Sequence, residues 1–326
     1  MCKLRVLVTG CVGFIGSWLV EKLLERGHEV IGIDCLTNYY SPKLKEYNMR
    51  NFVANPRFKF LRIDLSEVSI DELVSIISKV GYVIHEAAQP GVRSSWGEEF
   101  REYVRHNVLA TQRLLEACVR VGTIKGFIYA SSSSVYGNPV RVPISEDHPT
   151  RPYSPYGVTK LTGEKLCLAY HDNYGLPIVI LRYFTVYGPR QRPDMAFHKF
   201  IKAMLKGDPI RVYGDGLQMR DFTYVQDVVE ATLLAMESGE EVDGEVMNIG
   251  SSRPIKLVDA IKTISDIIGK EPMIIFESAK KGDVRVTYAD DTKARKLLGW
   301  KAKTKLRDGL VEEVRWIKNM MSIGLI

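Results

Sequence analysis

A glycine-rich loop near the amino terminus constrains the fold more than any other feature of this sequence. Gly10, Gly13 and Gly16 stand three residues apart, after the short β-branched run 4–8 and at the start of an apolar stretch with helical spacing, residues 14–26. A strand that turns through glycines into a helix gathers backbone N–H groups and the positive end of the helix dipole at one point. The loop therefore predicts a site for the phosphates of a nucleotide.

Asp34 adds a second nucleotide signal. It ends the next predicted strand, residues 30–33. A carboxylate at this place accepts hydrogen bonds from both ribose hydroxyls and repels a 2′-phosphate. NAD is therefore the expected cofactor, ahead of NADP.

Strands and helices alternate along the first 180 residues. The further predicted strands are residues 58–63, 82–85, 126–130 and 178–181, and the predicted helices are residues 70–79, residues 99–121 and a helix after Pro155. This rhythm is typical of an α/β protein with a doubly wound parallel sheet of the Rossmann type, covered by helices on both faces.

The rhythm loosens after Tyr183, where shorter elements are separated by turns that contain glycine and proline. We predict two domains. Residues 1–183 together with 222–251 would bind NAD, and a smaller substrate domain would comprise residues 184–221 and 252–326.

Composition excludes several other classes of protein. Lys and Arg exceed Asp and Glu by 45 to 39, a formal net charge of +6, but no run of five like charges suggests a nucleic-acid-binding arm. Five scattered cysteines form no C-x-x-C pair, so neither a disulfide framework nor a metal centre is expected. No stretch approaches the ~20 apolar residues of a membrane span. We expect a cytoplasmic protein that binds neither nucleic acid nor membrane.

Tyr156 and Lys160 are the strongest catalytic candidates. Four residues apart on a predicted helix, they share one face. A phenol with a reference pKa near 10 can act as a base if a close lysine cation and an oxidised nicotinamide ring lower its pKa. A hydroxyl cluster, Ser131 to Ser134, ends the preceding buried strand and would lie nearby.

These motifs together carry a family resemblance. TGCVGFIG, ASSSSVYG, YGVTK, LRYFTVYGPRQRP and RDFTYVQD resemble the NAD-dependent nucleotide-sugar epimerases and dehydratases of the extended short-chain dehydrogenase/reductase family, over essentially the full chain. The resemblance implies that Ser132 bonds the sugar O4, with Ser133 beside it in the catalytic group. It also implies that Tyr156 is the base and that Lys160 holds the nicotinamide ribose.

The resemblance also implies binding residues. Those for the cofactor are Gly10, Gly13, Phe14, Ile15, Gly16, Asp34, Asp64, Leu65, Ala87, Ala88, Gln89, Tyr156, Lys160 and Tyr183, with Asp64 beside the adenine and Tyr183 beside the nicotinamide. Those for the nucleotide sugar are Arg93, Thr185, Arg192, Arg220 and Lys280. Thr185 and Lys280 stand where many relatives have Asn and Arg.

The serine run separates reaction types within the family. Related 4,6-dehydratases carry Thr-Asp-Glu where this chain has Ser132, Ser133 and Ser134, and related decarboxylases carry Glu at position 134. The resemblance therefore implies 4-epimerisation, by oxidation at C4 and reduction on the opposite face.

Arg190 and Arg192 bear on the choice of sugar. Their string, RYFTVYGPRQRPDMAFH, resembles bacterial UDP-glucuronate 4-epimerases, and Arg192 is the expected ligand of the sugar carboxylate. Other functions stay open. The chain could be a 4-epimerase of UDP-glucose or of UDP-N-acetylglucosamine, in which these arginines bind only phosphate or solvent, or a UDP-glucuronate decarboxylase. A non-enzymatic alternative is a catalytically silent NAD sensor on the same fold. By resemblance, helices near 104–118 and 161–168 would pair in a homodimer.

Overall fold

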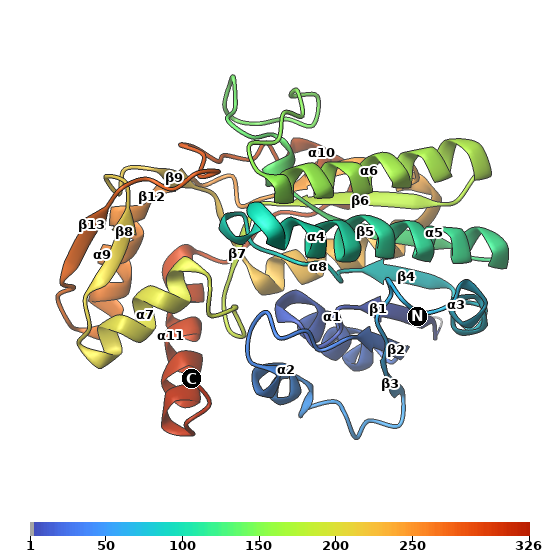
Figure 1. Cartoon of the computed structure of the whole chain (residues 1–326), viewed down its shortest axis with the longest axis horizontal. Coiled ribbons are helices and arrows are strands. Elements are labelled where there is room, and N and C mark those ends of the chain that lie inside the picture. The colour runs from blue at the N-terminus through green and yellow to red at the C-terminus, as the bar shows by residue number, and fades with distance from the viewer. Residues whose placement is uncertain (1–2) are drawn as a thin grey trace.

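Seven parallel strands form the central sheet, in the order β11-β6-β5-β4-β1-β2-β3 (Figure 1). They are β1 (Arg5–Thr9), β2 (Glu29–Asp34), β3 (Phe58–Arg62), β4 (Tyr82–His85), β5 (Gly126–Ser132), β6 (Ile178–Tyr183) and β11 (Val246–Ile249). The computed structural model describes residues 3–326. The predicted Rossmann-type sheet is confirmed, with strand ends shifted by one or two residues. Strand order reverses between β1 and β4, and a crevice opens at the carboxyl ends of the strands at such a point.

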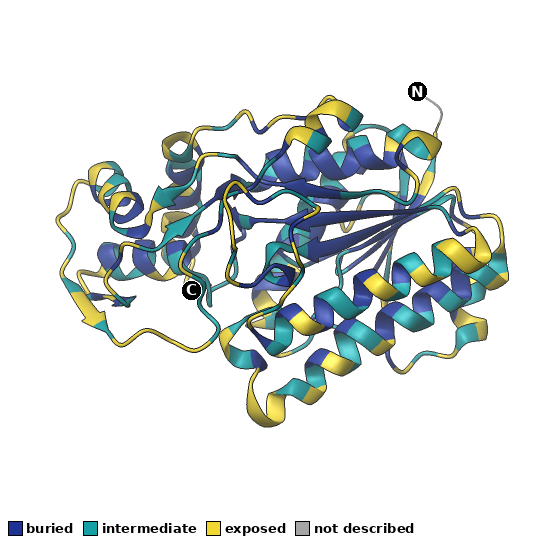
Figure 2. Cartoon of the chain, turned by 90° about the horizontal axis from the view of Figure 1, so that it is seen from above, coloured by how far each residue is buried: buried dark blue, intermediate teal, exposed yellow. Residues whose placement is uncertain are grey.

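Helices cover both faces of the sheet. One face carries α1 (Phe14–Glu25), α8 (Val225–Ser238) and α10 (Thr292–Leu298), and the other carries α3 (Ile70–Ile77), α5 (Ala110–Val121) and α6 (Pro155–Tyr174). Side chains alternate along β1, so that Val6 and Val8 enter the first apolar core and Leu7 enters the second. Buried strands lie between helices whose outer sides are exposed, as Figure 2 shows.

The start of α6 is fixed by its own sequence. The Ser154 hydroxyl accepts a hydrogen bond from the Gly157 N–H at 3.1 Å, and Pro155 occupies the first turn, where its missing N–H costs nothing. Gly175 ends the helix in the left-handed conformation, with φ 65°. Since Tyr156 and Lys160 lie in the first two turns, this cap sets where both side chains begin.

The predicted helix over residues 99–121 contains an irregularity that the sequence did not reveal. A short helix, α4 (Phe100–Tyr103), passes through a π-helical turn (Val104–Leu109) into α5. Buried Asn107 lies in that turn, where it accepts from the Gln89 N–H at 2.6 Å and donates to the Thr159 hydroxyl at 3.0 Å. The wider turn thus ties the end of β4 to α6, in keeping with the frequent place of π-bulges at functional sites.

The remaining elements lie together at the left of Figure 1. They are three two-stranded sheets, β7 (Thr185–Tyr187) with β10 (Phe222–Tyr224), β8 (Ile210–Tyr213) with β13 (Ile274–Glu277), and β9 (Met219–Arg220) with β12 (Ile255–Lys256), and the helices α7 (Ala196–Lys206), α9 (Leu257–Ile268) and α11 (Leu306–Ser322). Helix α2 (Pro42–Met49) follows β2. Phe197, Ile261 and Ile317 belong to a separate apolar core under α7, α9 and α11.

Residues 3–326 contain no helix with both the length and the apolar character needed to cross a lipid bilayer.

A buried ion pair joins α6 to the sheet. Arg182 on β6 donates to both carboxylate oxygens of Glu164 on α6, from Nε at 2.9 Å and from Nη2 at 2.8 Å. Its Nη1 donates to the Tyr136 hydroxyl at 2.8 Å, and the Ser131 hydroxyl donates to Glu164. The side chains of Arg182 and Glu164 are 6% and 1% exposed, so each charge depends on the other for compensation.

Arg182→Met should leave Glu164 as an uncompensated buried charge and lower the free energy of unfolding by about 3–5 kcal/mol. Chemical denaturation measures this. The double variant Glu164→Leu/Arg182→Met removes both charges and should recover most of the loss. A single variant within about 1 kcal/mol of wild type would contradict the role given to the pair.

Candidate active site

A long cleft crosses the carboxyl edge of the sheet at the predicted crevice. Its volume is about 1110 Å³ when the open solvent at its mouth is included. Its wall contains most of the residues expected to bind the cofactor, namely Gly10, Gly13, Phe14, Ile15, Gly16, Asp34, Leu65, Ala87, Ala88, Gln89, Tyr156, Lys160 and Tyr183, and also Arg192. The structure therefore brings the glycine loop and the tyrosine–lysine pair to one cavity.

The glycine loop allows very close backbone approach. A Cβ at Gly16 would lie 2.1 Å from the Gly10 carbonyl oxygen, and Gly10 has φ 66°, a conformation that favours glycine. Helix α1 begins after Gly13 without a side-chain cap and without an acidic residue in its first turn. Its first N–H groups and its dipole therefore suit an anion such as a pyrophosphate.

Asp34 lies at the end of β2, where a carboxylate can accept hydrogen bonds from a ribose. Its Oδ1 accepts from the Leu36 N–H at 2.8 Å. Burial raises the pKa of Asp34, while the Lys45 ammonium and the Leu36 N–H oppose that rise. Lys45 was not among the predicted residues; it lines the cleft and donates to the Thr37 carbonyl at 3.0 Å. A helix start that suits an anion, a carboxylate acceptor and the tyrosine–lysine pair along one cleft together fit a dinucleotide such as NAD.

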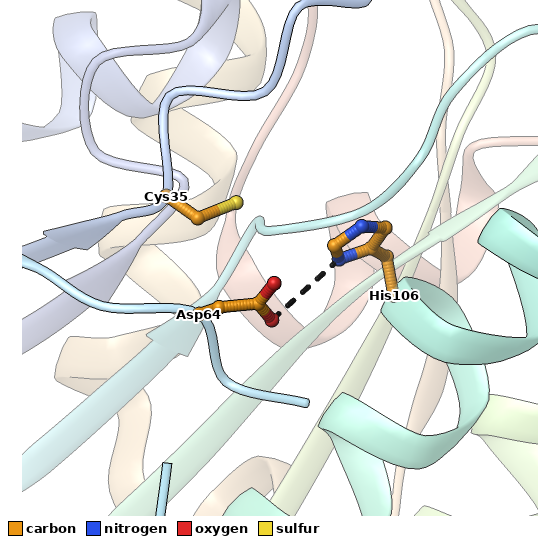
Figure 3. A group of neighbouring side chains, drawn as sticks. All are labelled: Cys35, Asp64 and His106. Carbon is orange, nitrogen blue, oxygen red and sulfur yellow. Dashed lines mark ion pairs between the residues drawn. The ribbon is translucent and has the colours of Figure 1, made fainter. Parts of the chain in front are cut away.

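Beyond β2 and β3 the wall contains Cys35 and His106, with Asp64 close by (Figure 3). Potential ligand atoms of these three residues lie within 4.8 Å of one another. Burial, followed by the charges of Asp34 and Asp64, raises the pKa of the Cys35 thiol to about 11, which disfavours the thiolate that a metal needs. Asp64 itself accepts from Ser66 at 2.6 Å and from Arg105 at 2.6 Å. We interpret this group as the end wall of the nucleotide cleft.

Tyr156 and Lys160 lie at the other end of the cleft. Burial raises the pKa of Tyr156, while the charge of Arg192 and the hydroxyl of Ser132 lower it without cancelling the rise. Burial lowers the pKa of Lys160 to about 8, and its Nζ lies 4.7 Å from the centre of the Tyr129 ring. Within the chain's own field Tyr156 is therefore a phenol at neutral pH, and Lys160 is not among the main groups that act on its pKa.

Glu86 is a cleft residue that the sequence analysis missed. It follows β4 directly, and the Tyr183 hydroxyl donates to its Oε1 at 2.8 Å. Burial raises the pKa of Glu86 to about 7, partly opposed by Tyr183 and by Lys160. Its charge is in turn the main influence that raises the pKa of Lys160 against burial. Glu86 lies between His85 and the expected Ala87–Ala88 segment. No sequence motif marks this position, so sequence reasoning did not select it.

The two arginines of the predicted sugar loop point to different places. Arg190, with φ 72°, stacks 3.9 Å above the Trp18 ring and donates to Glu21 on α1 at 2.6 Å. Arg192 instead lines the cleft and acts on the pKa of Tyr156. Only Arg192 is therefore available to a ligand there, and the other arginine anchors the loop.

A second hollow of about 550 Å³ contains two of the expected substrate residues, Thr185 and Arg220, and Ser133, which was expected to be catalytic. Ser133, Ser134, Thr185 and Arg220 line it together with Asp283. Buried Asp221 accepts from the backbone N–H groups of Ser251 at 2.8 Å and Ala289 at 2.9 Å, whereas the neighbouring Arg220 donates to the Met219 carbonyl at 2.9 Å. The guanidinium of Arg220 remains in a region that suits an anion.

Arg93 and Lys280 meet outside both cavities. Both cations lie over the Tyr213 ring, at 4.3 Å and 4.9 Å from its centre, and Arg93 also pairs with Asp283 at 2.7 Å. The structure therefore brings these two expected substrate residues together beside the second hollow. Ser132 lies elsewhere, at the end of β5, where its hydroxyl acts on the pKa of Tyr156.

Two features define an extended short-chain dehydrogenase/reductase. One is a Rossmann sheet whose glycine loop lines a nucleotide cleft, and the other is a helix that presents a Tyr-x-x-x-Lys pair to the same cleft. The model of the NAD dependent epimerase/dehydratase family matches residues 6–250. The chain belongs to this family.

Named relatives cover nearly the whole chain. An uncharacterized UDP-glucose epimerase of Bacillus subtilis (strain 168), YtcB, is 45% identical over 97% of this chain and 99% of its own length. The UDP-glucuronate 4-epimerase of Thermodesulfobacterium geofontis is 37% identical over 97% of both. The crystal structure of the UDP-glucuronic acid 4-epimerase of Bacillus cereus, in complex with UDP-glucuronic acid and NAD, is 45% identical with a TM-score of 0.94, over 97% of this chain and 100% of that one.

Lys160→Met should stabilise the protein at pH 7 and lose that advantage as pH rises. The pKa of Lys160 is about 8 in the folded chain against an ordinary 10.5, so its contribution to stability is fully present above 10.5 and is lost as pH falls to 8. Removing the buried charge should therefore gain at most about 3 kcal/mol below pH 8. Urea unfolding at pH 7 and pH 10 measures the change.

The exposed Lys165 on the same helix provides a matched control. Lys165→Met should shift stability equally at both pH values. If Lys160→Met is less stable than wild type at pH 7 and remains so at pH 10, the Lys160 charge is fully compensated and the prediction is wrong.

Proposed function

We propose that this protein is an NAD-dependent 4-epimerase that interconverts UDP-glucuronate and UDP-galacturonate. The observation that carries the proposal is Arg192, a cation in the cleft wall beside Tyr156, at the place where a uronic acid would present its carboxylate. The Bacillus cereus relative, whose complex contains UDP-glucuronic acid and NAD, supports the same sugar and cofactor.

Bound NAD supplies the acceptor, and then the donor, of the hydride at C4 of the sugar. Tyr156 takes the proton of the 4-hydroxyl during oxidation and returns it during reduction. Ser132, whose hydroxyl already acts on the pKa of Tyr156, hydrogen-bonds the sugar O4. Since burial keeps the pKa of Tyr156 high, its ionisation depends on added positive charge near the phenol.

Lys160 holds the nicotinamide ribose. Its pKa is about 8, because burial lowers it and the Glu86 carboxylate partly opposes that effect. Without Glu86, Lys160 would be neutral more of the time near physiological pH. Glu86 therefore helps to maintain the cation that would contact the ribose.

The serine run keeps the reaction to epimerisation. Ser133 and Ser134 line the second hollow with neutral hydroxyls, where relatives that eliminate water or CO2 carry acidic residues. No carboxylic acid at these two positions is available to protonate C5. The 4-keto sugar is therefore not committed to elimination, and it can turn within the site and be reduced on its other face.

We assign the UDP moiety to the second hollow. Arg220 in its wall is available to phosphate, and Thr185 adds a hydroxyl; Arg93 and Lys280 lie next to it. The separate core under α7, α9 and α11 supports a division into a cofactor domain, residues 1–183 and 222–251, and a nucleotide-sugar domain, residues 184–221 and 252–326.

We further propose a cytoplasmic homodimer. Val104 and Leu109, in the segment near 104–118 that is expected to pair, are apolar side chains that are 40% and 43% exposed. Cys11, Cys35, Cys118 and Cys167 are free thiols, in keeping with a reducing compartment.

The function is tested by incubating the protein and NAD separately with UDP-glucuronate, UDP-glucose and UDP-N-acetylglucosamine, and identifying the products by NMR. UDP-galacturonate should form fastest. Tyr156→Phe should lower turnover by about 10²–10⁴-fold because it removes the proton acceptor, while NAD binding measured by calorimetry changes little. Faster turnover of UDP-glucose would favour the UDP-glucose 4-epimerase, the activity in the name of the Bacillus subtilis relative.

Arg192→Ala should lower kcat/KM for UDP-glucuronate at least tenfold, since a hydrogen-bonded charge pair contributes roughly 1.5–3 kcal/mol. Turnover of UDP-glucose, whose sugar carries no charge, should fall by a smaller factor, because the variant also removes the charge that lowers the pKa of Tyr156. The fraction of decarboxylated pentose product should also rise. Equal loss with both sugars would contradict a carboxylate role for Arg192.

A further inference from the structure

Arg192 is held from one side by a carboxylate of its own loop. Its Nε donates to Asp194 Oδ1 at 3.0 Å and its Nη2 donates to Oδ2 at 3.1 Å. Burial alone would raise the pKa of Asp194, but the charge and hydrogen bonds of Arg192 bring it below its ordinary value. Asp194 is therefore ionised at neutral pH, and the two parallel bonds fix the plane of the guanidinium.

This fork leaves the other end of the guanidinium available. Arginine has five N–H donors, and Asp194 takes the one on Nε and one of the two on Nη2. Both donors of Nη1 and the second donor of Nη2 remain. Within the described residues, Arg192 donates to no side chain other than Asp194. A second carboxylate can therefore form its own paired bonds at this end, in a plane that Asp194 has already set.

Asp194 is itself anchored across the cleft mouth. The Tyr39 hydroxyl donates to its Oδ2 at 3.3 Å and lies 3.2 Å from the Ser94 hydroxyl, which lies 2.6 Å from the Tyr103 hydroxyl. Gly91, with φ 103°, makes room for this chain, because a Cβ there would lie 2.3 Å from the Tyr39 oxygen. The segments after β2 and β4 thus hold the carboxylate that holds Arg192.

We propose that Asp194 is a positioning residue that sets the orientation of Arg192, and thereby decides whether the substrate keeps its carboxylate. This inference rests on the proposed function, since it concerns the uronic acid bound at the free end of Arg192. Asp194 does not touch the sugar, and its effect passes through the guanidinium.

The chemistry explains why orientation matters more than charge at this place. After C4 is oxidised, the carboxyl carbon is attached to C5, next to the ketone. If the C5–C6 bond stands perpendicular to the ketone plane it can break. CO2 then leaves, the electron pair passes through C5 to the C4 oxygen, and C5 takes a proton from water. A guanidinium that keeps the carboxylate near the ketone plane prevents this cleavage.

Asp194→Asn tests the proposal through the distribution of products. The amide keeps one acceptor oxygen but loses the charge and the paired bonds, so the guanidinium can rotate. We expect the ratio of UDP-pentose and its 4-keto precursor to UDP-galacturonate, measured by NMR, to rise at least fivefold. KM for UDP-glucuronate should stay within threefold or fall, because a negative charge beside the anion has been removed. Arg192→Ala should instead raise KM.

Two further variants distinguish positioning from general loosening of the loop. Tyr39→Phe leaves the Arg192–Asp194 ion pair but removes the hydroxyl that donates to Asp194, and it should raise the same product ratio by a smaller factor. This variant also tests the proposal if Asp194→Asn does not fold. Glu21→Gln removes the charge of the carboxylate that holds Arg190 in the same loop, on the side facing α1, and should leave the ratio unchanged.

An unchanged product ratio in both Asp194→Asn and Tyr39→Phe would overturn the inference while wild-type turnover of UDP-glucuronate upheld the proposed function. An equal rise in Glu21→Gln would also overturn it, because loop mobility would then be the cause. A wild-type protein without activity on UDP-glucuronate would overturn both.

Discussion

The attachment of α6 to the sheet is the constraint on which the rest of the site depends. Arg182 and Glu164 meet through two hydrogen bonds in the core, between the helix that carries Tyr156 and Lys160 and a strand beside the one that ends at Ser132. Replacing such a pair by apolar residues need not cost stability. Its planar geometry instead favours one register of helix on sheet, and that register sets the reach of the tyrosine toward both the nucleotide cleft and the sugar.

Charges inside the cleft are arranged in opposed pairs, and this arrangement explains how one chain can tolerate them. Arg192 is hydrogen-bonded to Asp194, and Lys160 lies close enough to Glu86 for that carboxylate to raise its pKa. Each pair lowers the cost of burial while leaving a cation with free donors toward the ligand. Tyr156 lies within the influence of Arg192 yet keeps a high pKa, so under the proposed function its ionisation depends on the positive charge that the oxidised nicotinamide adds. Such dependence would limit proton abstraction to the occupied enzyme.

Sequence patterns predicted the sheet and much of the cleft because they depend on local rules. Glycines at Gly10 and Gly16 are required by backbone contact, and the spacing of Tyr156 and Lys160 is fixed by one helix. The residues that were missed act across the chain. Glu86 gains its role only when β4 lies beside the helix of Lys160, and Asp194 only when Tyr39 reaches it from a loop 155 residues away. The different directions of Arg190 and Arg192 likewise depend on Trp18 and Glu21, and loop sequence alone does not encode them.

In the proposed reaction, hydrogen leaves C4 of the sugar and returns to the same carbon on the other face. UDP-glucuronate deuterated at C4, incubated with the wild-type protein and unlabelled NAD, shows whether it does. We expect UDP-galacturonate that retains deuterium at C4, with no net change in the redox state of the cofactor and little CO2. Product that carries solvent hydrogen at C4, or a labelled pentose as the main product, would contradict it.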